Sequence, residues 1–70
     1  MNDLNQRLLA AHGADDRAAL VDLYTEAADG ANTLDAACFY LTHAYIFALD
    51  TGHVAAPALH ARLKSHGREE

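Results

Sequence analysis

Residues 34–49 read LDAACFYLTHAYIFAL, a stretch without glycine or proline and with few polar side chains. At about 3.6 residues per turn, this stretch predicts a helix that is apolar around most of its circumference. Such a helix has to be covered on more than one side, and in a chain of 70 residues only other helices can cover it. The stretch therefore predicts a small all-α domain built around one central helix.

Glycines divide the rest of the chain into further helical segments. We predict four helices, at residues 3–12, 15–29, 33–51 and 54–66. The predicted N-caps are Asp3, Asp15 or Asp16, and Asn32 or Thr33. Gly13 should take the left-handed conformation just past the first helix, and Pro57 fits the first turn of the fourth. Short connections predict antiparallel neighbours, so the expected fold is two helical hairpins packed around the third helix.

The expected core lies mainly on the third helix, which should be the most buried of the four. Its core-facing side carries Leu34, Ala37, Cys38, Leu41, Tyr45 and Ala48. Leu20, Leu41 and Tyr45 should lose nearly all solvent exposure, and the thiol of Cys38 should be buried and structural rather than a nucleophile. Residues 1–70 should form a single domain, with a frayed tail at about residues 68–70.

Size favours self-association. A chain of 70 residues buries only about 60% of its unfolded surface and is marginally stable alone. A single cysteine permits no internal disulfide, and no cysteine and histidine cluster has zinc-site spacing. Small domains without disulfides or structural metal ions often gain stability by oligomerisation, and the commonest soluble oligomer is the homodimer.

The charge distribution argues against nucleic acid as a partner. The net charge is −5, and no lysine or arginine occurs between Arg17 and Arg62. The middle of the protein should therefore repel phosphate. The central apolar stretch is too short and too interrupted by Asp35 and His43 to span a membrane, and residues 1–13 lack the pattern of a signal peptide. We therefore expect a cytoplasmic protein.

A polar sector on the third helix contains two large apolar residues. At about 100° per residue, Asp35, Thr42, His43 and Asp50 share a sector with Phe39 and Ile46. Either the first helix folds over these apolar residues, or they form a surface for self-association or for a partner. The predicted interface is Phe39, His43 and Ile46.

The other candidate sites are weaker. Asp22, Glu26 and Asp29 lie, with Asp15, on an acidic side of the second helix, which is either a solvated face or a docking face for a basic peptide. The histidines are His12, His43, His53, His60 and His66. No pair of them has the i, i+4 spacing of helical metal sites, although Asp50 and His53 could converge at a helix end. We predict no catalytic residue, metal site or cofactor.

Two segments are similar to tetratricopeptide-type helical repeats. Residues 19–28, ALVDLYTEAA, resemble the second helix of such a repeat, where an alanine, an aromatic residue and another alanine make close helix contacts. Residues 41–45, LTHAY, resemble the core of its first helix. The resemblance covers about residues 19–63 and implies a scaffold that docks proteins or peptides. Thr42 and the position of Pro57 depart from the repeat pattern, so a generic bundle with the same packing residues stays open.

These observations predict a non-enzymatic helical module for protein–protein interaction, acting as a homo-oligomer. Two hairpins are fewer than the three or more repeats of a stable array, which again favours self-association. Two alternatives remain open at this point: a small metal- or ligand-binding protein that uses its histidines, and an accessory subunit of a larger enzyme.

Overall fold

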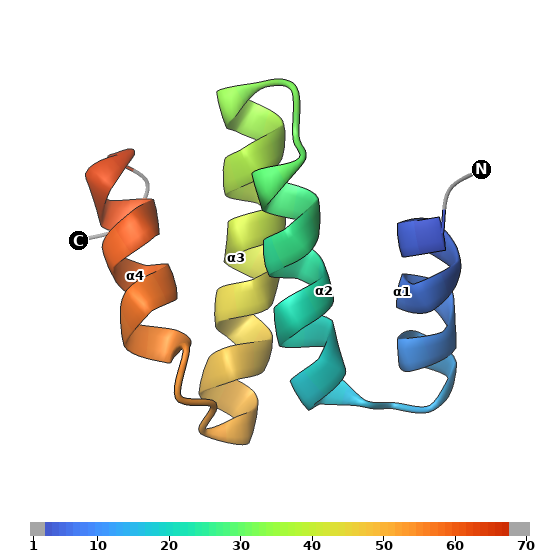
Figure 1. The fold of residues 1–70 in the computed structure, drawn as a ribbon. Coiled ribbons are helices and arrows are strands. Elements are labelled where there is room, and N and C mark those ends of the chain that lie inside the picture. Colours follow the sequence, from blue (N-terminus) through green and yellow to red (C-terminus); the bar gives the residue numbers. More distant parts are fainter. Residues whose placement is uncertain (1–2, 68–70) are drawn as a thin grey trace.

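The computed structural model describes residues 3–67, which form four helices without any strand (Figure 1). They are α1 (Asp3–Gly13), α2 (Arg17–Asp29), α3 (Leu34–Thr51) and α4 (Ala56–Ser65). The predicted all-α fold of four short helices is confirmed, and each helix begins and ends within two residues of its expected bounds. The expected frayed tail at residues 68–70 lies outside the described residues.

Side-chain caps start the two central helices. Asp16 accepts a hydrogen bond from the backbone N–H of Ala19 at 3.2 Å, and Thr33 accepts one from the N–H of Ala36 at 3.1 Å. These bonds satisfy N–H groups that have no partner inside the helix. Pro57 lies in the first turn of α4, as predicted.

The end of α1 differs from the prediction. Gly13 is the last helical residue, and the left-handed residue of this turn is Asp15, with φ 53°. The N–H of Asp15 donates to the carbonyl of His12, and the N–H of Asp16 donates to that of Ala11. This pattern is a Schellman motif, which requires the left-handed residue two positions beyond Gly13. Aspartate tolerates that conformation better than most residues.

The helices stand side by side in a row that is one helix thick (Figure 1). The contact between α2 and α3 is the most extensive; among the described residues α1 packs mainly against α2, and α4 mainly against α3. The Cα atoms extend over 32 × 28 × 12 Å. This row leaves two broad sides of the molecule without a covering layer.

The α2–α3 contact holds most of the core. The principal cluster of buried residues is Val21, Ala28, Cys38, Leu41, Ala44, Ala48, Leu59 and Leu63. A second cluster joins Ala11 of α1 to Leu20 and Leu23 of α2. Leu41 is 0% exposed and Leu20 is 1% exposed, and the thiol of Cys38 is buried, which confirms those three predictions.

Three predictions about burial were wrong. Tyr45 is only half-buried, because it lies toward α4, where its ring packs beside His60 with 5.5 Å between ring centroids. Leu34 is exposed because it is the first residue of α3, at the tip of the helix. The most buried helix is α2, with five buried residues out of 13 against four out of 18 in α3. The reason is that α3 keeps one side uncovered.

Candidate interaction surface

The uncovered side of α3 carries a row of large apolar side chains. Phe39 is 58% exposed, Ile46 is 56% exposed and Leu49 is 59% exposed. Together with Thr42 they follow one another at intervals of three, four and three residues, so they lie along one line of the helix. We call Phe39, Thr42, Ile46 and Leu49 the α3 stripe.

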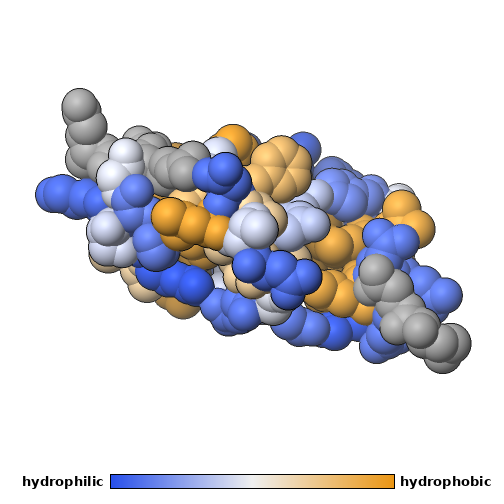
Figure 2. Space-filling model, turned by 90° about the horizontal axis from the view of Figure 1, so that it is seen from above, coloured by the Kyte–Doolittle hydropathy of each residue, from blue (hydrophilic) through white to orange (hydrophobic). Residues whose placement is uncertain are grey.

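No other helix of the described residues covers the α3 stripe. The main packing partner of α1 is α2, and Phe39 and Ile46 stay exposed, so the alternative in which the first helix folds over them is wrong. Figure 2, which views the molecule from above, shows apolar side chains reaching the surface between polar ones. The hydroxyl of Thr42 donates to the carbonyl of Cys38 at 2.8 Å, so its donor would stay satisfied if the stripe were covered.

The stripe borders an open hollow of about 500 Å³. Its lining residues all belong to α3: Asp35, Cys38, Phe39, Thr42 and His43. A hollow made by one helix is a gap between successive turns, not a cleft between helices. It is open to solvent and larger than one side chain, so it is a shallow depression along α3 rather than an enclosed ligand cavity.

His43, the third residue of the predicted interface, turns away from Ile46. Its ring stacks on that of Tyr24 in α2 with 5.1 Å between centroids, and its Nδ1 donates to the carbonyl of Phe39 at 2.9 Å. Tyr24 is the centre of an aromatic cluster, since it also stacks on Phe47 and its hydroxyl lies 2.9 Å from Nε2 of His12. This cluster ties α1, α2 and α3 together, so the structural role of His43 is to join the stripe to the interior.

Two of the three carboxylates of the predicted docking face on α2 are paired with arginines of other helices. Glu26 accepts two hydrogen bonds from Arg7 of α1. Asp29 lies 2.8 Å from the guanidinium of Arg62 in α4. Asp22 lies 3.9 Å from Nε2 of His53. The predicted docking face of Asp22, Glu26 and Asp29 is therefore neutralised in part within the chain, which weakens its attraction for a basic peptide.

Asp15 and Asp50 are bridged by Arg17. The guanidinium donates to Asp50 of α3 and, at 3.2 Å, to Asp15. The hydrogen bond that Arg17 donates to Asp50, and then the one that it donates to Asp15, raise the pKa of Arg17. Arg17 therefore lies at the C-terminal end of the α3 stripe, beside Asp50. The sequence had suggested Asp50 as a neighbour of His53.

The other three histidines lie apart from the aromatic cluster and from one another. Nδ1 of His53 accepts from the N–H of Ala55 ahead of α4, and His60 packs on Tyr45. His66 caps the C-terminus of α4. Within residues 3–67, no three side chains of the types that ligate metals come together. In the same part of the chain, no helix has the length and apolarity needed to cross a membrane.

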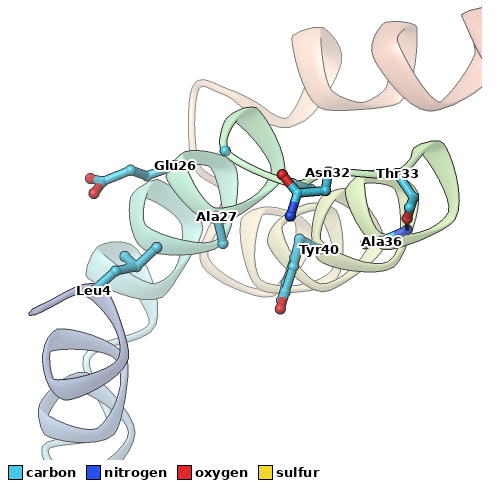
Figure 3. A pocket seen from close by; sticks show the side chains of 9 residues that line it. Leu4, Glu26, Ala27, Asn32, Thr33, Ala36 and Tyr40 are labelled. Atoms are coloured by element: carbon cyan, nitrogen blue, oxygen red, sulfur yellow. Dashed lines mark hydrogen bonds between the residues drawn. The ribbon is translucent and has the colours of Figure 1, made fainter. Parts of the chain in front are cut away.

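A second hollow, of about 420 Å³, lies where α1 approaches the connection between α2 and α3 (Figure 3). Leu4, Ala27 and Tyr40 line it from three helices, and Asn32 lies at its rim. Sequence reasoning missed this hollow because its walls come from segments that only the tertiary structure brings together. It contains no pair of groups arranged for acid–base or nucleophilic chemistry.

Comparisons with known proteins add no relationship. No protein-family model matches the chain, no curated protein matches its sequence, and no solved structure matches its fold at a significant level.

Proposed function

We propose that this protein is a non-enzymatic helical interaction module that self-associates through the α3 stripe. The single observation that carries this proposal is the row of Phe39, Ile46 and Leu49, each more than half exposed on one line of α3. A polar side chain at any of these positions would leave the buried core unchanged, because none of the three belongs to it. The resemblance to tetratricopeptide-type scaffolds also supports a docking role.

The energy available from covering the stripe fits a weak dimer. Complete burial of a large apolar side chain stabilises by about 1.5–3 kcal/mol, and these three side chains start partly covered. A contact between two helices is also at the small end of specific protein interfaces. The cost of association has to be met from this gain. We therefore propose dimerisation at micromolar concentrations rather than an obligate complex.

Sedimentation tests the proposal. The molecular mass of the wild type and of a variant with Phe39→Asp and Ile46→Asp would be measured by analytical ultracentrifugation over a range of concentrations. The wild type should approach the mass of a dimer as concentration rises, and the double variant should stay monomeric, because two carboxylates would have to be desolvated in the interface. Far-ultraviolet circular dichroism should show equal helix content.

A matched control separates the stripe from general surface hydrophobicity. Leu9 is 65% exposed on α1, so Leu9→Asp removes an equally exposed apolar side chain elsewhere. This variant should dimerise like the wild type. A monomeric wild type at high micromolar concentration, or a double variant that still dimerises, would contradict the proposal.

A further inference from the structure

The hollow beside Phe39 has the geometry of a hole in helix–helix packing. Asp35, Cys38, Phe39 and Thr42 occupy positions i, i+3, i+4 and i+7 of α3. Four residues at this spacing form the hole into which a side chain of a facing helix inserts in knobs-into-holes packing. The hollow therefore has room for an apolar side chain carried by another helix.

The same helix carries suitable side chains at its other end. Ile46 and Leu49 project from the C-terminal half of α3, whereas the hole lies in the N-terminal half. Two copies of α3 that run in opposite directions bring each C-terminal half to the other copy's hole. A two-fold axis repeats this contact, so both holes are filled at once.

The helix dipoles favour the antiparallel direction over the parallel one. Asp35 lies at the N-terminal end of the hole, and Arg17 lies beside Asp50 at the C-terminal end of the helix. In a parallel pair, the two Asp35 carboxylates would face each other. In an antiparallel pair, each Asp35 lies near the end that carries Arg17 together with Asp15 and Asp50, so these side-chain charges do not distinguish the two directions. The helix macrodipoles, however, are opposed only in the antiparallel pair.

We infer that two copies of this chain pack α3 against α3 in antiparallel orientation, with Ile46 or Leu49 of each copy seated in the hole beside Phe39 of the other. This inference rests on the proposed self-association and adds the identity of the partner surface and its direction.

Thiol cross-linking tests the direction. In a Cys38→Ala background, the residue to be linked is replaced by cysteine in three variants: Asp35→Cys, Thr42→Cys and Asp50→Cys. With a rise of about 1.5 Å per residue, positions 35 and 50 are about 22 Å apart along the helix. A short bismaleimide cannot bridge that distance between equivalent positions of an antiparallel pair. Ultracentrifugation first establishes that the background variant has the same oligomeric state as the wild type.

Antiparallel packing predicts a distinct pattern of products. Thr42→Cys lies near the middle of the helix and should cross-link with itself, whereas Asp35→Cys and Asp50→Cys should each give little dimer alone. A mixture of the last two, exchanged before the reagent is added, should give cross-linked dimer at several times the yield of either alone.

Other patterns overturn the inference. Efficient self-cross-linking of Asp35→Cys and of Asp50→Cys would show a parallel pair and leave the proposed function standing. A dimer in which Thr42→Cys does not react would show that another surface is used, and a monomeric wild type would overturn the proposed function as well.

Discussion

At the scale of single residues, stability should depend on a few side chains that are completely enclosed between α2 and α3. Leu41 is 0% exposed, and Leu→Ala changes at such sites remove transfer energy and leave a cavity. Leu41→Ala should lower the free energy of unfolding by about 2–5 kcal/mol, which urea denaturation at fixed protein concentration would measure. Leu9→Ala should cost less than about 0.5 kcal/mol. Equal costs for the two changes would contradict the assigned core.

Two glycines at helix ends should respond differently to the same substitution. Gly52 closes α3 with φ 65°, a conformation that costs an L-residue about 1–2 kcal/mol. Gly30 follows α2 with φ −94°, and an added Cβ there would meet its nearest atom at an ordinary 3.7 Å. Gly52→Ala should therefore lower the thermal unfolding midpoint, whereas Gly30→Ala should leave it unchanged or raise it slightly. A larger effect at Gly30 would show that the end of α3 is misassigned.

At the scale of helices, position in the row should set local stability. Within the described residues, the backbones of α1 and α4 each pack closely against one neighbouring helix, whereas those of α2 and α3 each pack against two. The ion pairs Arg7–Glu26 and Arg62–Asp29 that hold the outer helices are exposed, and such pairs contribute about 0–1 kcal/mol. Amide protons of α1 and α4 should exchange faster than those of α2 and α3 in native-state hydrogen exchange. Slow exchange in α1, equal to that in α2, would contradict this arrangement.

The helices themselves could be predicted from the sequence because their signals are local. Thr33, Gly52 and Pro57 act within one turn of the chain, so cap and breaker chemistry indicates the bounds directly. The end of α1 was less predictable, because Asp15 rather than Gly13 takes the left-handed conformation. Local chemistry allows either residue to end the helix.

Burial was harder to predict because a helical wheel shows which residues share a side, not which sides have neighbours. Tyr45 was expected in the core because the wheel places it near Leu41, but α4 covers it only in part. The exposed position of Phe39 and Ile46 on the polar side was apparent from the wheel. Leu49 was missed as their continuation, although the spacing of three and four residues from Phe39 through Thr42 would have indicated it.

At the scale of the whole molecule, a row of helices one layer thick explains why apolar surface remains on α3. Closing the row into a bundle would need close packing of α1 against α3 or α4; among the described residues α1 reaches α3 only through side chains such as His12, whose ring lies 6.1 Å from that of Phe47. The chain therefore buries its core mainly at one helix pair and leaves the α3 stripe exposed in a single copy. Covering that stripe with a second copy is the central claim.

Isotope-filtered nuclear Overhauser spectroscopy tests this claim most directly. In a mixture of carbon-13-labelled and unlabelled protein, the filter detects only contacts between different copies of the chain. We predict contacts from the methyl groups of Ile46 and Leu49 in one copy to the ring of Phe39 in the other, at concentrations where the dimer is populated. Spectra without contacts between copies, or with such contacts confined to Leu9 or Val54, would contradict the claim.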